Sequence, residues 1–188
     1  MDPTRDVVMS TNPRSFGPGV LSREQLRERT VGDRPLITDW LDLDAQLQPN
    51  GFDLTLRQVS RFEGRGAIAV DNAGRTLPTL APLAFGTDGV LDLPPGPYHI
   101  LYNEVVHLPT DLMALGRPRS SLGRCGVAIH TAVWDAGYEG RSTSLLVVTN
   151  PHGFRVERDA RVMQLVFFGL ATAAAEGYRG AYQGENLG

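Results

Sequence analysis

Residues 118–140 are the most informative part of this chain, because they gather side chains that could bind and act on a phosphate. The run PRSSLGR provides two guanidinium groups and two hydroxyls, on Arg119, Ser120, Ser121 and Arg124. Together with free backbone N–H groups, these donors can bind the oxygens of a polyphosphate. A helical turn here could bring both arginines to one side. For the segment taken alone, solvated arginines beside a serine-rich turn are the commoner explanation.

A carboxylate with apolar neighbours follows in HTAVWDAGYEG. Asp135 stands after Trp134 and before Ala136-Gly137, a turn signal. A carboxylate there can be partly shielded from water and still reach a cavity, as a general base requires. An aspartate that stabilises the turn by accepting from the next backbone N–H groups explains the same residues equally well. Tyr138 fits either a ring packed flat against a sugar or one more core aromatic.

The remaining polar candidates are less specific. Asn50-Gly51 predicts a turn and Asp53 opens an alternating strand, which by itself indicates a hairpin. Gln164 stands in the apolar run RVMQLVFF, where a buried glutamine costs about 1–3 kcal/mol unless it is hydrogen-bonded. We therefore expect it to have a backbone or ligand partner. The glycine-rich end GYRGAYQGENLG is either a frayed terminus or a flap that orders over a ligand.

Composition excludes several classes of protein. The chain has 188 residues, 41% of them hydrophobic, which fits one domain with a real core. Its net charge of −3 argues against non-specific binding to nucleic acid. All 18 basic residues are arginines, so every cationic phosphate contact must come from a guanidinium, whose planar fork suits phosphate oxygens.

The remaining composition argues against disulfides, cysteine-rich or histidine-rich metal sites and membrane spans. Cys125 is the single cysteine, so intrachain disulfides are excluded and a small buried apolar residue is expected. The four histidines show no metal-ligand spacing. No stretch approaches the roughly 18 apolar residues of a membrane span, and the polar start is not a signal peptide. We expect a cytoplasmic protein with no membrane partner.

The pattern along the chain predicts a mainly β fold. Residues 1–18, rich in Pro, Ser and Gly, predict a flexible arm before a domain over 19–170 and a tail over 171–188. Ser22 followed by Gln25 is a capping-box pattern, which predicts a short helix over SREQLRER. Strands are predicted for RQVSRFE, AIAV, HILYNEVVHL, TSLLVVT and VMQLVFFGL. The result would be a sandwich or distorted β-barrel with one or two short helices.

The order of these motifs resembles that of the dUTPase and dCTP deaminase superfamily. The motifs LQPNGFDLTL, PRSSLGR, HTAVWDAGYEG, ARVMQLVFF and AYQGE follow one another in the same sequence, from about Leu21 to the C-terminus. The opening LSREQLRER and the LQP run look most like the deaminase and archaeal-type dUTPase branch. The resemblance implies a jelly-roll-like homotrimer with active sites between subunits. It also implies a deoxynucleoside triphosphate substrate, with Mg²⁺ bound through the phosphates.

Within that superfamily, one position favours dUTPase over deaminase. The deaminase pattern places a glutamate in the strand after the GYEG-type turn, and the matching place here is Ser144-Leu145. No acid lies between Glu139 and Glu157, so deamination lacks its acid–base residue. The dUTPase carboxylate that activates water for attack on the α-phosphate is matched by Asp135. The alternatives are a dCTP deaminase, bifunctional if another acid substitutes, and a noncatalytic nucleotide-sensing trimer.

The resemblance also implies roles for the other site residues in hydrolysis of dUTP to dUMP and pyrophosphate. The backbone around the HTA motif would read the uracil edge, and the Tyr138 ring would press on the deoxyribose and disfavour a 2′-hydroxyl. The C-terminal tail would close over the active site. The base-reading residues would be Ile129, His130, Thr131, Ala132 and Val133. The triphosphate would be held by Arg119, Ser120, Ser121, Arg124, Gln164, Tyr182 and Gln183.

Overall fold

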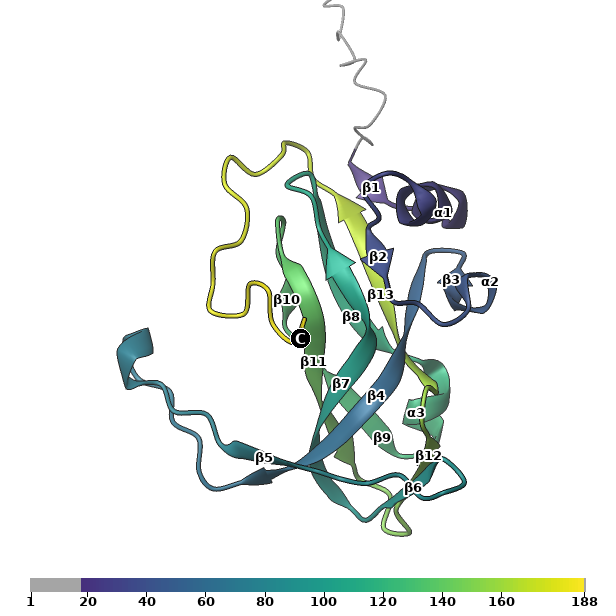
Figure 1. Cartoon of the computed structure of the whole chain (residues 1–188), viewed down its shortest axis with the longest axis vertical. Helices are drawn as coiled ribbons and strands as arrows, with labels where there is room; N and C mark the ends of the chain where they lie inside the picture. Colours follow the sequence, from purple (N-terminus) through teal and green to yellow (C-terminus); the bar gives the residue numbers. More distant parts are fainter. Residues whose placement is uncertain (1–17, 188) are drawn as a thin grey trace, which may run out of the picture.

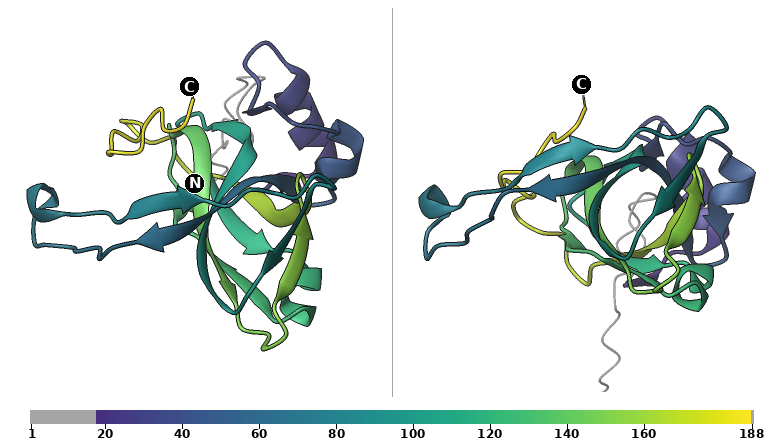
Figure 2. Two further views of the ribbon diagram at one scale, coloured as in Figure 1. Left: turned by 60° about the horizontal axis from the view of Figure 1, so that its bottom comes forward. Right: turned by 90° about the horizontal axis from the view of Figure 1, so that it is seen from below.

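A long antiparallel sheet curls around the apolar core in the computed structural model, which describes residues 18–187 (Figure 1). Seen along a perpendicular direction, the strands wrap around the core as an incomplete barrel (Figure 2). The mainly β, barrel-like prediction is confirmed. The predicted arm over residues 1–18 lies outside the described residues except for Pro18.

Antiparallel pairing fixes the strand order of this sheet. The main path is β10 (Val133–Trp134), β8 (Leu112–Pro118), β13 (Arg161–Gly169), β4 (Gly51–Glu63), β7 (Gly96–His107), β11 (Glu139–Val148) and β9 (Val127–His130). Shorter strands pair alongside it: β1 (Gly19–Val20), β2 (Ile37–Thr38), β3 (Leu47–Gln48) and β5 (Thr79–Pro82). A separate two-stranded sheet joins β6 (Val90–Leu93) and β12 (Phe154–Glu157).

The core is formed by the inward faces of the long strands. Phe52, Leu54, Tyr102, Leu165 and Phe167 are all fully buried there. Successive side chains of a strand point to opposite faces, so the apolar residues of β4, β7 and β13 meet inside the curl. The predicted strands HILYNEVVHL, TSLLVVT and VMQLVFFGL fall within β7, β11 and β13, respectively.

The two edges of the curled sheet meet where the chain passes from β9 to β10. β9 pairs with β11 and β10 pairs with β8, and only residues 131–132 connect them. We call residues 129–133 the seam. Each edge strand has one side outside the ladder, where backbone N–H and C=O groups can bond to a ligand.

Three short α-helices accompany the sheet, where the sequence predicted one or two. α1 (Arg23–Val31) starts at Ser22 with the predicted capping box, in which the Ser22 and Gln25 side chains each accept from the other's backbone N–H. α2 (Leu43–Gln46) is a single turn capped by Asp42. α3 (Ser120–Arg124) lies directly after β8. No helix within residues 18–187 is long and apolar enough to cross a membrane.

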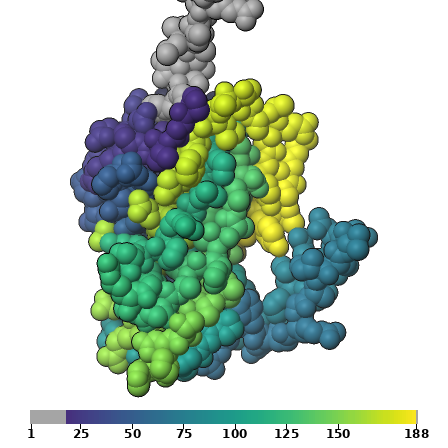
Figure 3. All heavy atoms as spheres, turned by 180° about the vertical axis from the view of Figure 1, so that it is seen from behind, coloured from purple at the N-terminus to yellow at the C-terminus, as the bar shows by residue number. Residues whose placement is uncertain are grey.

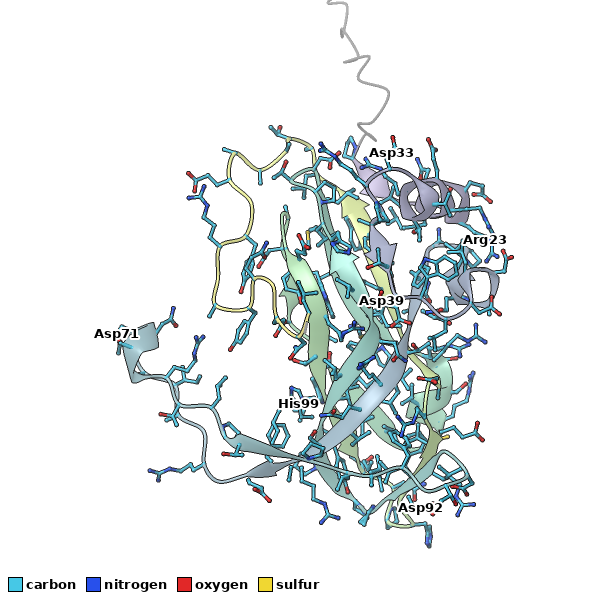
Figure 4. The ribbon with its side chains drawn as sticks, in the orientation of Figure 1. Arg23, Asp33, Asp39, Asp71, Asp92 and His99 are labelled. Carbon is cyan, nitrogen blue, oxygen red and sulfur yellow. The ribbon has the colours of Figure 1, made fainter. Side chains whose placement is uncertain are left out.

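Residues 64–78 form an arm that projects from the barrel between β4 and β5 (Figures 1 and 3). Asp71, at its far end (Figure 4), caps the short 3-10 helix η1 (Asn72–Gly74). The predicted AIAV strand is wrong. Ala67 makes one bridge to Thr76, while Ile68 and Val70 are 82% and 110% exposed, so these apolar residues have no partner strand in the described chain.

The prediction for Cys125 is also wrong. Cys125 is exposed and follows the last turn of α3, where its backbone N–H donates to the Ser121 and Leu122 carbonyls. Leu122 is the buried residue that anchors this turn to the core. Cys125 thus ends a surface helix instead of filling space inside.

Candidate active site

α3 presents the predicted phosphate-binding donors to solvent. The Arg119 backbone N–H donates to the Val162 carbonyl at 3.1 Å, which fixes the start of the helix against β13. Ser120, Ser121 and Arg124 are exposed, and Arg124 Nη1 donates to Ser120 Oγ at 3.2 Å. The predicted helical turn is therefore present, and its side chains present hydrogen-bond donors from a helix that is fixed to β13 at its start.

A buried carboxylate, for which the sequence predicted only a place in a strand, supports this loop. Asp53 is 1% exposed, and its Oδ2 lies 3.2 Å from Arg119 Nε and 3.5 Å from Arg161 Nη1. Burial raises the pKa of the Asp53 carboxyl, and the two guanidinium groups oppose that rise. The signal in the sequence was an acid in the apolar strand start GFDLTL. The buried Asp53 carboxylate therefore holds the Arg119 side chain in place from the protein interior.

Gln164 lies one strand away from Asp53, in β13. Its Cα registers with Asp53 in β4 and with Arg117 in β8. The side chain packs over Gly51, where an added Cβ would lie 2.7 Å from Gln164 Nε2. The expectation of a buried glutamine is corrected, because Gln164 is half-buried and reaches solvent. A protein partner is therefore not required for it.

The seam lies against an open cavity of about 500 Å³. Ile129 is buried, Thr131 is half-buried, and His130, Ala132 and Val133 are exposed. The cavity is lined by Leu115, Gly116, Arg117, Thr131, Ala132, Val133, Val166 and Phe168. Arg117 is a cation that the sequence analysis passed over, although it stands just before the RSSLGR run. The cavity combines apolar walls with an exposed backbone edge and one guanidinium.

Asp135 sits on a turn that is held by backbone hydrogen bonds. Tyr138 N–H donates to the Asp135 carbonyl at 3.0 Å, and Gly137 N–H donates to the Pro109 carbonyl at 3.3 Å. Within residues 18–187 the Asp135 carboxylate has no hydrogen-bond or ion-pair partner, and the residue is exposed. The turn-stabilising role considered for this side chain is absent there. The expected partial shielding from water is also absent within residues 18–187. The backbone hydrogen bonds hold the turn in place, and the Asp135 carboxylate on it is open to solvent.

Tyr138 is buried, with 6% of its surface exposed, as the core-aromatic alternative expected. Its hydroxyl lies 3.1 Å from Ser142 Oγ and donates to Glu185 Oε1 at 2.9 Å. Trp134 Nε1 donates to the same Ser142 Oγ at 2.6 Å. Burial raises the pKa of the Tyr138 hydroxyl, so it is a hydrogen-bond donor throughout the working pH range. The two aromatic residues on either side of Asp135 are therefore bound into one buried polar network.

The C-terminal tail packs against the Asp135 turn of its own chain (Figure 1). Gln183 uses both ends of its amide there, since Nε2 donates to the Gly137 carbonyl and Oε1 accepts from Glu139 N–H. Tyr182 is 39% exposed, and the Arg75 guanidinium of the arm lies 5.4 Å from its ring centre. Gln183 thus lies beside the Asp135 turn, whereas the Tyr182 ring contacts the arm.

A second cavity, of about 650 Å³, lies behind the same turn. It reaches from Tyr138 to the end of α1. His107 Nδ1 lies 3.3 Å from Glu139 Oε1, and Arg29 Nη2 lies 3.4 Å from Asp111 Oδ2 on its walls. Glu28, Asp33 and Arg34 also line it, so side chains of both signs surround this cavity.

The predicted catalytic residue and the predicted phosphate-binding residues of α3 therefore lie toward opposite ends of β8, and the seam is a separate set. Trp134 registers with Ala114 near the start of that strand, and α3 follows its end. Seven residues of strand span about 20 Å at roughly 3.3 Å per residue. One chain brings Asp135, Tyr138 and Gln183 together, and separately brings the start of α3 close to Gln164.

Comparisons with known proteins define the class. A family model described as dCTP deaminase-like matches residues 20–170. A protein of Methanosarcina mazei named "Probable deoxyuridine 5'-triphosphate nucleotidohydrolase" is 49% identical over 167 residues, covering 89% of this chain and 98% of the relative. A protein of the same name from Archaeoglobus fulgidus is 49% identical over 168 residues, with the same coverage of both chains.

A solved structure shares the fold. The 2'-deoxycytidine 5'-triphosphate deaminase from Agrobacterium tumefaciens superposes with a TM-score of 0.62 at 24% identity over 82% of this chain. The chain spans about half of that deaminase chain, 49% of its length. The chain belongs to the dCTP deaminase-like family, within the dUTPase and dCTP deaminase superfamily, and the resemblance drawn from its motifs is confirmed.

Proposed function

We propose that this protein hydrolyses dUTP to dUMP and pyrophosphate. The observation that carries the proposal is the Asp135 carboxylate, which is exposed, without a partner in the described chain, and held on a backbone-bonded turn. The corresponding position for base chemistry, Ser144-Leu145, bears a hydroxyl and an isobutyl group inside β11. The names of the archaeal relatives support the same activity.

Water attack on the α-phosphate needs a base, and Asp135 is the proposed one. The water oxygen forms a bond to the α-phosphorus while the bond from that phosphorus to the bridging oxygen breaks. The water proton passes to the Asp135 carboxylate, and pyrophosphate leaves with the electron pair. A base of this kind contributes about 10²–10⁴ to the rate.

The triphosphate would bind the α3 donors, with Gln164 as a further polar contact. α3 offers guanidinium and hydroxyl donors, which match phosphate oxygens and not a metal ion. We therefore propose that Mg²⁺ arrives on the triphosphate, where it would neutralise charge that develops on the phosphate oxygens. Tyr182 and Gln183 would contact the phosphates from the tail.

A complete site would need a second copy of the chain. Asp135 and α3 lie at opposite ends of β8, so α3 of one subunit would face the Asp135 turn of its neighbour. This arrangement supports the proposed homotrimer with sites between subunits. A head-to-tail contact of this kind closes into a ring when its rotation allows.

The seam would read the base. Its unpaired backbone edge beside the 500 Å³ cavity can match the donors and acceptors of uracil and leave those of cytosine unpaired. The buried Tyr138 ring would limit space at the 2′-position of the sugar.

Asp135→Asn tests the assignment. We expect kcat for dUTP to fall by at least about 10²-fold with stability unchanged within about 0.5 kcal/mol, because the carboxylate has no structural partner. Asp33→Asn, the same change at another exposed acid, is the matched control and should retain full activity. Near-normal dUTP hydrolysis by Asp135→Asn would refute the assignment. Ammonia release from dCTP would favour the deaminase instead, and tight dUTP binding without pyrophosphate release would favour a sensor.

A further inference from the structure

Glu185, near the end of the chain, is built into the interior of the Asp135 region. Its backbone carbonyl accepts from Arg141 N–H at 2.9 Å, and its Cα forms a parallel bridge with Gly140 at the start of β11. Its side chain turns inward, where Oε1 accepts from the Tyr138 hydroxyl at 2.9 Å. The tail is thus attached by both its main chain and this carboxylate.

Glycine at position 140 provides the space for that contact. A Cβ added there would lie 2.7 Å from the Tyr138 hydroxyl and 3.2 Å from Glu185 Cγ. Any side chain at position 140 would displace one of these two groups. The contact between tail and turn therefore depends on close packing as well as on a hydrogen bond.

The hydrogen bonds continue from Glu185 toward Asp135. The Tyr138 hydroxyl also contacts Ser142 Oγ, and Trp134 Nε1 donates to that same oxygen. Trp134 directly precedes Asp135 in the chain, and Tyr138 closes the turn that carries it. If the Glu185 side chain moved, Tyr138 and Trp134 would lose part of this hydrogen-bond network, and these two residues lie on either side of Asp135.

We propose that Glu185 is a positioning residue that fastens the C-terminal tail to the Asp135 turn and fixes Tyr138 and Trp134 around Asp135. It touches neither substrate nor reacting atoms, and it acts through the Tyr138 hydroxyl. Its effect on turnover rests on the proposed dUTP hydrolysis, whereas its effect on tail docking does not.

The proposal includes a direction for the pH dependence of docking. Burial raises the pKa of the Glu185 carboxyl, and the hydrogen bond from Tyr138 partly opposes the rise. A carboxyl whose pKa is higher in the docked state favours docking at low pH, and this contribution is lost as pH rises through the docked-state pKa. The charged neighbours are already paired, since Arg141 Nη2 lies 2.6 Å from Asp39 Oδ2 and Glu139 pairs with His107. The Tyr178 ring contacts the Tyr138 ring edge to face, and its backbone N–H donates to the Ala136 carbonyl.

Hydrogen exchange of the tail in the full-length protein, without nucleotide, tests docking directly. We expect amides of residues 176–187 to exchange about tenfold faster in Glu185→Ala, because the part-buried hydrogen bond from Tyr138 to the carboxyl is lost. Glu185→Gln should retain the protection, since its amide oxygen still accepts from Tyr138, and should lose the pH dependence. Glu176→Gln, an exposed acid in the same tail that pairs with Arg179, should leave the exchange unchanged. Unchanged exchange in Glu185→Ala, or equal loss in Glu185→Gln, would overturn the proposal.

Kinetics of the same variants test the positioning role. We expect Glu185→Ala to lower kcat for dUTP more than it raises KM. The proposed phosphate donors of α3 are held by contacts that do not include Glu185, so release of the tail would remove only the contacts from Tyr182 and Gln183. Combining Glu185→Ala with Tyr138→Phe should lower kcat no further than the larger single change, since both break one hydrogen bond. Independent, multiplicative losses would overturn the role. If the wild-type protein failed to hydrolyse dUTP, the exchange result would still decide whether Glu185 docks the tail.

Discussion

The buried carboxylate of Glu104, in β7, offers a quantitative test of how the barrel supports the segment that holds α3 in place. Glu104 is fully buried and accepts three hydrogen bonds, from Gln46 Nε2 at 2.6 Å, Thr55 N–H at 2.9 Å and Thr55 Oγ1 at 2.6 Å. Gln46 Nε2 also donates to the Asp53 carbonyl at 2.8 Å. Glu104 therefore connects α2 and β7 to the β4 segment that carries Asp53.

Glu104→Ala should destabilise the protein by about 3–5 kcal/mol. Each buried donor left without an acceptor costs about 1–3 kcal/mol, and the missing side chain leaves space that the core fills only in part. Thr55 N–H is a backbone donor and cannot turn away, whereas the Thr55 hydroxyl can rotate, which keeps the sum below three full penalties. For a domain of this size the loss corresponds to a fall in Tm of about 10–15 °C.

Glu104→Gln separates the hydrogen bonds from the volume. Both carboxylate oxygens accept, so the amide NH₂ of glutamine must face a donor in either orientation. We expect a loss of about 1–3 kcal/mol. Burial raises the pKa of the Glu104 carboxyl, so its contribution to stability is fully present below the unfolded-state pKa and is lost as pH rises through the folded-state pKa. Glu104→Gln cannot ionise and should remove this part of the pH dependence.

Urea unfolding at one protein concentration, repeated across pH, measures both effects. Glu157→Ala, an exposed glutamate in β12, is the control and should change the unfolding free energy by no more than about 0.5 kcal/mol. A loss below about 1 kcal/mol in Glu104→Ala would refute the reasoning, because it would mean that the three donors find other partners at no cost.

Two further predictions concern the two ends of β8. Asp53→Asn should destabilise the protein by about 3 kcal/mol in urea unfolding, because Arg119 and Arg161 lose a buried partner. Asp44→Asn is the control and should cost less than about 1 kcal/mol, because its exposed carboxylate pairs with Arg23 and Arg27 at the surface. Equal costs would contradict the role of burial. Gly137→Ala should release the tail to proteolysis, because a Cβ there would lie 2.5 Å from Gly177 Cα. Gly64→Ala is the control and should leave the tail protected, because Gly64 has nearly the same φ, 85° against 83°, and open space around it. A released tail in both variants would point to backbone strain and not to the contact.

Local patterns were sufficient to predict much of the fold. The capping box at Ser22 and Gln25 predicted α1 because both partners lie within one turn of helix. Dense runs of β-branched and other apolar residues predicted β7, β11 and β13, because a strand in the middle of a sheet is recognised mainly by the apolar composition of its own residues. AIAV failed because a strand also needs a partner, and residues 64–78 leave the sheet.

The chemistry was harder to predict where it depends on distant pairing. The RSSLGR donors and Asp135 could be found from residue type and turn signals. The pairing of Asp53 with Arg119 could not, because the register of β4, β13 and β8 brings them together. Glu185 could be seen in the sequence only as a tail residue, since its partner Tyr138 lies in another motif.

The exposure of Asp135 has a different meaning in an assembly than in one chain. A carboxylate in open water is a weak base, and its environment must change before it can act near neutral pH. Within residues 18–187 nothing supplies that change, because the turn is already complete and the Asp135 side chain has no partner there. A neighbouring subunit that brought α3 and a bound triphosphate over the turn would exclude water and place phosphate charge beside the carboxylate. Assembly would then supply both the missing donors and the desolvation, and a variant unable to assemble should bind and hydrolyse dUTP poorly although Asp135 and α3 are intact.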